Sequence, residues 1–271
     1  MWDDPRGVNV NKAKRTSVSV ALLIAAAAFA PPAHALSGKE VLSLLKLIDQ
    51  RQRNSGDWKA RFFLEQKQKD KDDIVYDGIY FRRDENDRLM ILFLKPKAER
   101  GKGYLRINKN LWFYDARVGK WERRTERERI GGTNSNRQDF DESRLAEEYI
   151  GRYLGDGKLG RYKTWRLELK AKKGVDVAYP KVRLWIDQAS KNILKRQDFA
   201  ASGKLLRTSY YPRWYKVHSP SKKADVWYPK EIRIFDEVEK ANRTTFLIRK
   251  VDLRSLPANI FTKAWLESKS R

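Results

Sequence analysis

The chain contains no cysteine and only two histidines, His34 and His218. A chain without cysteine forms no disulfide and offers neither a catalytic thiol nor a cysteine-ligated zinc site. His218 stands in an irregular basic stretch with no nucleophile-elbow motif near it, so we expect it to lie outside any catalytic triad. Walker and EF-hand motifs are missing as well. We therefore predict no catalytic residues, no metal and no cofactor.

Long apolar runs are also rare. The longest one beyond residue 35 is Leu89–Leu94, far short of the roughly twenty residues that a membrane-spanning helix needs. A shorter run near the start, Val20–Ala30, precedes the small-residue site Ala33-His34-Ala35. The basic residues before it are Arg6, Lys12, Lys14 and Arg15. This order is typical of a secretory signal peptide, and a retained membrane anchor, the alternative, would need a longer apolar run. We expect cleavage after Ala35, so that residues 1–35 are the signal peptide and residues 36–271 form one periplasmic domain.

Acidic residues are outnumbered by basic ones, 35 to 59, which gives a formal net charge of +24. Loss of the leader removes four basic and two acidic residues and leaves +22. A positive field of this size favours acidic proteins or phosphate-bearing lipids as partners, and export argues against nucleic acid. The alternative is that Lys and Arg only protect sheet edges from aggregation.

Alternating apolar and polar residues predict about eleven β-strands, in two runs at 57–124 and 161–252. No strand-helix-strand pattern indicates a parallel sheet, so we expect a mainly β, antiparallel fold. The capping box Ser37 to Glu40 predicts an amphipathic helix before the first strand. Strand 89–94 is apolar on both faces, which requires a cover on each side, one of which could be this helix. A short helix is expected after Leu256-Pro257.

Residues Ile130–Ile150 separate the two runs of strands. Gly131 and Gly132 predict a turn, and the spacing of Leu145, Tyr149 and Ile150 predicts a helix after it. The acids of this segment are Asp139, Asp141, Glu142 and Glu148. We interpret them as residues that complement a helix N-terminus, while a glycosidase-like carboxylate pair is the alternative. Further along, Gly155–Gly160 matches G-x-G-x-x-G, but no strand precedes it and no helix follows, so we predict a loop.

The order of several motifs resembles the outer-membrane lipoprotein-sorting proteins of the LolA-like and LolB-like carrier superfamily. These motifs follow a signal peptide and an amphipathic helix, and they are Leu92-Phe93-Leu94-Lys95-Pro96, Asn110-Leu111-Trp112-Phe113-Tyr114-Asp115, the segment from Gly131-Gly132-Thr133 to Tyr149, and Leu256-Pro257-x-x-x-Phe261. The resemblance covers most of residues 37–266. It implies a half-open antiparallel β-barrel with covering helices and an apolar cavity that accepts acyl chains.

The strand that ends at Pro96 lines the cavity in such carriers, so the resemblance assigns Leu89, Ile91 and Phe93 to the lining. Inward-facing positions of other strands extend the expected lining to Phe62, Leu64, Trp112, Tyr114, Trp165, Leu167, Leu169, Leu184 and Ile186. Composition alone also allows these aromatic residues to be packed core or base-stacking groups. Gly131, Gly132, Leu145 and Tyr149 are expected in a lid. The carriers have an Arg-Pro after their second strand, and this chain has Arg83 without the proline as the expected lid-lock.

The resemblance implies a monomeric, non-enzymatic carrier that moves a lipoprotein or phospholipid by its acyl chains across the periplasm in outer-membrane biogenesis. Its partners would be an inner-membrane transporter that supplies the cargo and an outer-membrane acceptor. The alternative is an exported structural or adaptor protein with a solidly packed barrel that docks acidic envelope partners. An enzyme acting on acidic glycans or lipids is a third candidate.

Overall fold

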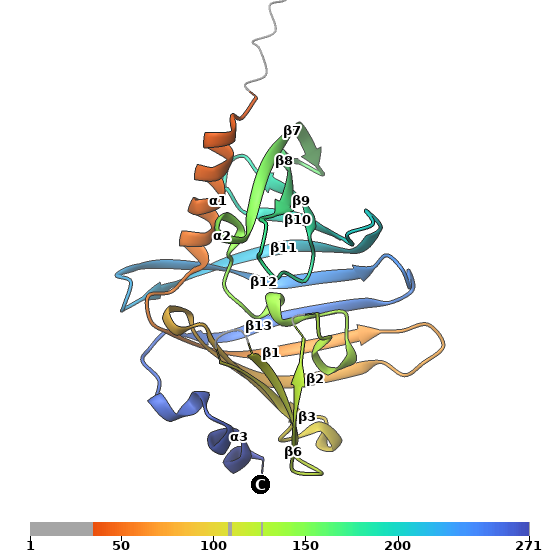
Figure 1. Cartoon of the computed structure of the whole chain (residues 1–271), viewed down its shortest axis with the longest axis vertical. Coiled ribbons are helices and arrows are strands. Elements are labelled where there is room, and N and C mark those ends of the chain that lie inside the picture. The colour runs from red at the N-terminus through yellow and green to blue at the C-terminus, as the bar shows by residue number, and fades with distance from the viewer. Residues whose placement is uncertain (1–34, 108–109, 126, 271) are drawn as a thin grey trace, which may run out of the picture. The chain divides into compact units, whose positions relative to one another are not determined.

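The computed structural model describes residues 35–107, 110–125 and 127–270. Almost all of the predicted leader lies outside these residues. The described chain is built around one antiparallel sheet of thirteen strands in the order β6-β5-β4-β3-β2-β1-β13-β12-β11-β10-β9-β8-β7 (Figure 1). The edge strands β6 and β7 do not pair with each other, so the sheet is half-open, as predicted.

The strands fall into the two expected runs. The first comprises β1 Asp57–Lys67, β2 Ile74–Arg83, β3 Arg88–Lys95, β4 Gly103–Ile107, β5 Asn110–Asp115 and β6 Lys120–Arg124. The second comprises β7 Tyr149–Leu159, β8 Tyr162–Ala171, β9 Lys181–Asp187, β10 Ile193–Phe199, β11 Leu205–Ser219, β12 Ala224–Asp236 and β13 Arg243–Asp252. The two runs join in the middle of the sheet, where β13 returns beside β1 and Phe246 lies opposite Leu64. The sheet therefore has a continuous inner face that both runs supply.

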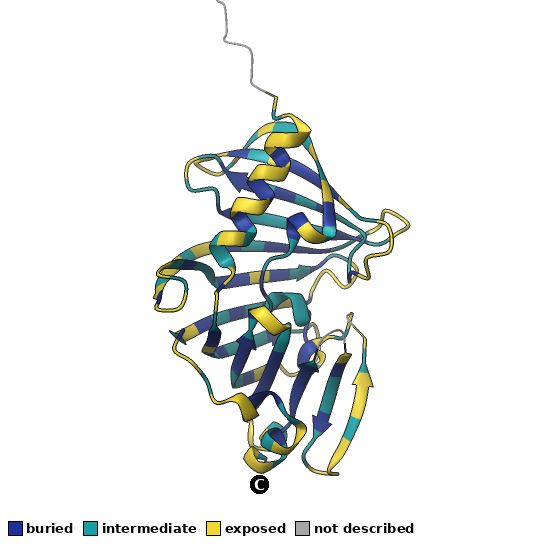
Figure 2. Ribbon diagram, turned by 60° about the vertical axis from the view of Figure 1, so that its left-hand side comes forward, coloured by how far each residue is buried: buried dark blue, intermediate teal, exposed yellow. Residues whose placement is uncertain are grey.

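The first helix, α1, covers Gly38–Gln52 and begins at the predicted capping box, in which the Ser37 hydroxyl accepts from the amide of Glu40. Its buried stripe is Val41, Leu44, Leu45 and Ile48. The stripe packs on the inner face against β7 and β12 (Figure 2), so α1 does not cover strand β3. Gly151 of β7 makes this close approach possible, because a Cβ there would lie 2.6 Å from Cγ1 of Val41.

The outer face of β3 is covered by the C-terminal segment of the chain. There the 3₁₀ turn η5, Ala258–Phe261, leads into helix α3, Lys263–Lys269. Both pack on the outer face of the first run of strands. The cluster that they complete, called here the outer cluster, contains Phe81, Met90, Leu92, Leu105, Tyr114, Ile260, Phe261 and Leu266. Strand β3 is thus apolar on both faces because the two faces belong to two different clusters.

The segment 130–148, called here the insert, is less regular than its apolar spacing predicts. It contains the 3₁₀ turns η3, Ile130–Gly132, and η4, Arg137–Asp139, and a single helical turn, α2, Leu145–Glu148. The helix expected to continue to Ile150 ends at Glu148, because Tyr149 begins β7 and pairs with Ala171 of β8. Short 3₁₀ turns elsewhere are η1, Asp84–Asn86, and η2, Lys97–Glu99.

Three sequence-based expectations about strands are wrong. Gly155–Gly160 is not a loop, since most of it lies in β7, where a bulge at Gly155 (φ +117°) leaves the strand paired with β8. The basic stretch around His218 is not irregular, since β11 continues to Ser219 with its bulges beside Pro212, where no ladder hydrogen bond is required. The short edge strand β6 and the glycine-rich β7 raise the count from about eleven to thirteen.

Candidate functional site

The inner face holds a large aromatic core, and most of the predicted lining residues belong to it. Phe62, Leu64, Leu89, Ile91, Phe93, Leu167, Leu169, Leu184 and Ile186 are all buried there, and Trp165 packs against them half-buried. Phe62 is central, with its ring centroid 6.1 Å from that of Phe93 and 5.9 Å from that of Phe246. Gly78 lies opposite Phe62 on β2, and a Cβ there would stand 2.5 Å from the Phe62 ring. The alternation of the strands therefore identified this face correctly.

Trp112 and Tyr114, however, lie on the outer face. Trp112 pairs with Leu105 of the outer cluster, and Lys263 of α3 stands 4.0 Å from the centroid of the Trp112 ring. Tyr114, two residues on, is part of the same cluster. The inner-face positions of β5 are Leu111 and Phe113. The run Leu111–Tyr114 is apolar on both faces, so its period alone could not distinguish the two sides.

The insert fills the inner face rather than covering an empty space. Phe140 reaches into the core, with its ring centroid 5.2 Å from that of Phe62 and 4.6 Å from that of Phe246. The predicted lid residues Leu145 and Tyr149 are buried beside it. The middle of the inner face is therefore occupied by the protein's own side chains.

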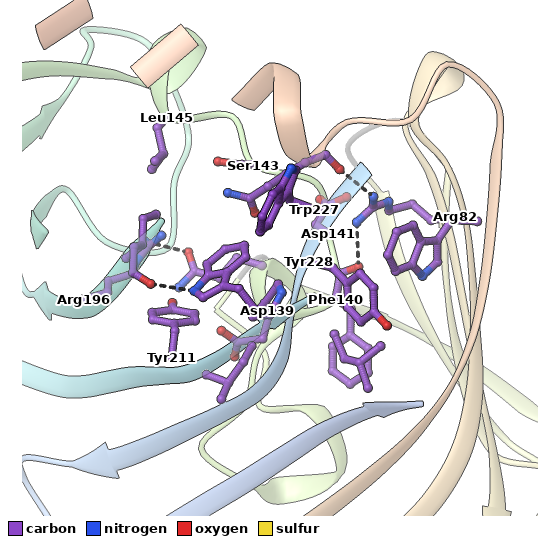
Figure 3. A pocket seen from close by; sticks show the side chains of 18 of the residues that line it. Arg82, Asp139, Phe140, Asp141, Ser143, Leu145, Arg196, Tyr211, Trp227 and Tyr228 are labelled. Atoms are coloured by element: carbon purple, nitrogen blue, oxygen red, sulfur yellow. Dashed lines mark hydrogen bonds between the residues drawn. The ribbon is translucent and has the colours of Figure 1, made fainter. Parts of the chain in front are cut away.

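A small internal cavity remains between the insert and the middle of the sheet (Figure 3). Its volume is about 80 Å³, and its lining includes Arg82, Phe140, Asp141, Arg196 and Tyr228. Pockets that bind drug-sized ligands have volumes of roughly 300–1,000 Å³. The cavity is thus too small for an acyl chain while the insert is in place.

Two buried ion clusters hold the insert on the sheet. In the first, Asp141 pairs with Arg106 of β4 at 2.8 Å and also with Arg137. In the second, Asp139 accepts from Arg207 of β11 at 2.9 and 3.0 Å. Burial alone would raise the pKa of both carboxyls, but the surrounding guanidinium groups outweigh it and hold each pKa below its usual range. Asp139 and Asp141 are therefore ionised anchors of the insert, each with arginine partners.

Helix α1 supplies a third anchor, which the sequence did not reveal. Asp49 accepts from the backbone amides of Leu145 and Ala146 at 2.9 and 2.7 Å, and from the Ser143 hydroxyl at 2.5 Å. Burial raises the pKa of Asp49 despite these donors. Asp49 thus binds the unpaired amides at the start of α2, which has no cap of its own.

The predicted lid-lock, Arg83, points away from the insert. Its guanidinium binds the carboxylate of Asp57 at 2.6 and 2.9 Å and the carbonyl oxygen of Leu256 at 3.1 Å. The neighbouring Arg82 occupies the inner-face position, where it donates to the carbonyl oxygen of Phe140 at 3.4 Å and to Asp84 at 3.1 Å. Because the two arginines are adjacent in the sequence, only the register of the strand decides which of them faces the insert. The contact with the insert belongs to Arg82.

One end of the inner face is open. A hollow of about 580 Å³, called here the open hollow, lies between the first run of strands and the start of the insert. Its wall consists of Tyr76, Phe93, Glu99, Tyr104, Phe113, Arg124, Thr125, Arg127, Glu128, Arg129, Gly131 and Gly132. The two predicted lid glycines have φ angles of +61° and +73°, a conformation that glycine adopts without strain.

Two tyrosines of the open hollow hold the backbone of Gly131. The Tyr76 hydroxyl donates to the Gly131 carbonyl oxygen at 2.9 Å, and the Tyr104 hydroxyl accepts from the Gly131 amide at 3.2 Å. Burial raises the pKa of Tyr76 to about 12. The aromatic wall of the open hollow is therefore hydrogen-bonded directly to the first turn of the insert.

Neither a membrane-spanning helix nor a metal site is evident among the residues that the structure describes. None of their helices is long and apolar enough to cross a bilayer. No group of three or more His, Asp and Glu side chains among them is arranged to hold a metal ion. His218 is exposed and lies 3.7 Å from Asp225.

Comparison with solved structures shows that the fold is shared with a protein described as a member of the LolA superfamily. A LolA superfamily protein of Nitrosomonas europaea superposes with a TM-score of 0.70 at 21% identity, over 85% of this chain and 100% of the other. A putative outer membrane lipoprotein-sorting protein domain of Vibrio parahaemolyticus gives 0.73 at 18% identity, with the same coverage of the two chains.

The family follows from a match to a family model, and a further solved structure shares the fold. A DUF1329 family protein of Desulfovibrio piger superposes with a TM-score of 0.73 at 15% identity, over 84% of this chain and 98% of the other. A family model described as "uncharacterized protein" matches residues 85–268, more than half of the chain, and the chain belongs to that family. No curated protein matches the sequence.

Proposed function

We propose that the protein is a non-enzymatic carrier that binds the acyl chains of a lipoprotein or lipid on the inner face of its half-open sheet. The observation that carries this proposal is that the aromatic inner face is closed by a separate insert, fastened by polar contacts, beside an open aromatic hollow of about 580 Å³. The same fold in a protein described as a lipoprotein-sorting domain supports the proposal.

In this mechanism the insert and the cargo compete for the same surface. Each CH₂ group that leaves water is worth about 0.8 kcal/mol, so a chain of sixteen carbons gains roughly 12 kcal/mol by transfer into an apolar site. Cargo that displaces Phe140 from between Phe62 and Phe246 would take over its contacts in the core. The structure described here then corresponds to the closed form.

The buried ion clusters favour closure of the insert and release of the cargo. Opening the insert separates Asp139 and Asp141 from their arginine partners on the sheet, which costs several kcal/mol unless water or cargo compensates. This cost offsets part of the gain from burying the acyl chains, so the carrier holds its cargo less tightly than an open barrel would. A carrier must release what it binds, and a self-closing insert favours release.

The remaining parts of the proposal concern place and partners. The predicted signal peptide implies export to the periplasm, between an inner-membrane transporter that supplies the cargo and an outer-membrane acceptor. The basic surface, with a net charge of +22 after cleavage, would favour docking to acidic partner proteins or to phosphate-bearing lipids. No covalent step is required, since the transfer is an equilibrium between apolar environments.

An engineered disulfide tests the role of the insert. Replacing Asp49 and Ser143 by cysteine places two thiols where the present side chains lie 2.5 Å apart, and the chain has no other cysteine. We expect the oxidised variant to lose uptake of a fluorescent fatty acid from vesicles and to regain it after reduction. Ser143→Cys alone is the control. Uptake by the oxidised variant at the rate of the reduced one would contradict the proposal.

An exported structural or adaptor protein is the second candidate, and the filled inner face favours it. In that case the cavity of about 80 Å³ is simply a packing defect, and the basic outer surface is the functional part. Native mass spectrometry of protein purified from the cell envelope separates the two candidates. Co-purified lipid supports the carrier, whereas lipid-free protein bound to an acidic protein supports the adaptor.

A further inference from the structure

A second hollow lies next to the open hollow and has a different chemistry. Its volume is about 270 Å³, and we call it the polar pocket. It is lined by Arg127, Arg129, Asn134, Asn136, Ala178, Tyr179, Pro180, Ala200, Ala201, Leu206, Arg207, Asp236 and Val238. Arg127 and Arg129 also line the open hollow, so the same short segment borders both.

Asn134 is the most unusual residue of the polar pocket. Only 6% of it is exposed, and neither its side-chain oxygen nor its side-chain nitrogen has a hydrogen-bond partner within the described part of the chain. Its backbone, in contrast, is fixed, because its amide donates to Gln66 and Thr244 and its carbonyl accepts from Arg207. A buried amide that is held in place without using its own polar atoms needs a partner from outside the protein.

The charges around the pocket favour an anion at its rim. Arg129 is neutralised by Asp236 at 2.9 Å, and Arg207 by Asp139 and Asp198. Arg127 is exposed and makes no ion pair with any residue that the structure describes. The positive charge of Arg127 therefore remains uncompensated beside the side-chain nitrogen and oxygen of Asn134.

We propose that the polar pocket binds a hydroxyl-bearing phosphate group, such as the glycerol phosphate head of an anionic lipid whose tail lies in the open hollow. A hydroxyl group both donates and accepts, so it can pair with the side-chain oxygen or nitrogen of Asn134. The phosphate pairs with Arg127. The flat ring of Tyr179 and the small side chains of Ala178 and Ala200 leave room for the carbon backbone of the headgroup. This inference rests on the proposed carrier function, because it names the class of cargo.

Calorimetric titration with three probes tests the pocket separately from the carrier function. The probes are lysophosphatidylglycerol, lysophosphatidylcholine with the same acyl chain, and free sn-glycerol 3-phosphate. We expect the wild-type protein to bind the glycerol lipid about tenfold more tightly than the choline lipid, as for the loss of a charged hydrogen bond. Asn134→Ala should remove this preference without changing the affinity for the choline lipid, whereas Arg127→Gln removes the partner of the phosphate that both lipids carry and should weaken the binding of both. Arg117→Gln, which removes an exposed charge outside both hollows, should keep the preference.

Each other outcome is decisive. A preference that survives in Asn134→Ala or is missing from the wild-type protein, or an Arg127→Gln variant that binds both lipids as tightly as the wild-type protein, overturns the polar pocket while lipid carriage stands. If neither lysolipid binds, the carrier function fails, and binding of free glycerol phosphate that Asn134→Ala abolishes would still support the pocket. Free glycerol phosphate that binds as tightly as the lipid would identify a soluble ligand instead. Hydrogen exchange of the insert in Asn134→Ala verifies that the segment around residue 134 keeps its position. Arg127→Gln is a second variant whose effect does not depend on the position of that segment, because Arg127 is exposed.

Discussion

The guanidinium of Arg106 on β4 and the carboxylate of Asp141 in the insert lie 2.8 Å apart, and only 3% of either side chain is exposed. Arg106 also pairs with Asp87, and Asp141 also pairs with Arg137. Because these charges are withdrawn from water, each depends on the other for compensation. The position of the insert is therefore coupled to the state of this ion cluster, together with the anchors at Asp139 and Asp49.

Replacing Asp141 by asparagine should release the insert. Removing one partner of a buried ion pair costs about 3–5 kcal/mol where the other charge is left uncompensated. Because Arg106 keeps its pair with Asp87, we expect a loss at the lower end of this range. We expect a lower midpoint of thermal unfolding and faster hydrogen exchange over residues 137–148. Asp77→Asn is the matched control, because Asp77 pairs with Arg61 at the same distance of 2.8 Å in a partly exposed position, where about 1 kcal/mol or less is expected. Equal losses in the two variants would show that burial does not decide the effect.

Acid should loosen the insert in a defined direction. The pKa of Asp139 and that of Asp141 lie below the ordinary value of 3.8, so the stability they contribute is complete above this pH and is lost as the pH falls below it. The raised pKa of Asp49 acts in the opposite sense, favouring the folded state as the pH falls. We expect protection of insert amides, corrected for intrinsic exchange, to decrease between about pH 4 and pH 2.

Two variants check this assignment. Asp141→Asn should show a flatter pH dependence than the wild-type protein, because one of the two titrating anchors is gone. Asp49→Asn should show a steeper loss toward acid, since the opposing contribution is removed. Protection that rises toward acid in the wild-type protein would contradict the assignment.

The sequence predicted the fold class and most of the inner face, for a physical reason. Strands such as Trp165–Leu169 and Val182–Ile186 bury one face only, so their alternation of apolar and polar residues reports the side directly. The antiparallel strands, the first helix with its capping box and the C-terminal helix all followed from local patterns of this kind, whereas the half-open form of the sheet was implied only by the family resemblance.

The remaining errors arise where local pattern carries no such information. Strand β5 has apolar residues on both sides, so Trp112 and Tyr114 were assigned to the wrong face. Glycine-rich β7 lacks the side chains that signal a strand, and its glycines are explained by the close approach of α1 and by a bulge. Arg82 and Arg83 differ only in register. Contacts between segments that are distant in the sequence, such as that of Asp49 with α2, are not predicted by any local sequence pattern.

Gly78 should be among the least replaceable residues of the sheet. A Cβ there would lie 2.5 Å from the Phe62 ring and 2.6 Å from the carbonyl oxygen of Leu92, so Gly78→Ala must displace the central ring. Overpacking of this kind costs about 1–3 kcal/mol, measured as the free energy of unfolding in urea. Gly38→Ala serves as the control, because nothing lies within 4 Å of a Cβ at this position in the first turn of α1. A neutral Gly78→Ala would show that the ring moves freely.

Removing the two hydroxyls that hold Gly131 should speed the opening of the insert at the open hollow. In a Tyr76→Phe, Tyr104→Phe double variant the aromatic wall is kept, while the carbonyl and the amide of Gly131 lose their partners. Each lost hydrogen bond is worth about 0.5–1.5 kcal/mol, so exchange at the Gly131 amide should accelerate by roughly tenfold. If the insert limits the uptake of lipid, the rate of transfer of a fluorescent fatty acid from vesicles should rise in parallel. Tyr153→Phe is the control, since its hydroxyl binds exposed Asp156 on β7, away from the insert. Faster exchange at Gly131 with an unchanged transfer rate would place the rate-limiting step elsewhere on the inner face.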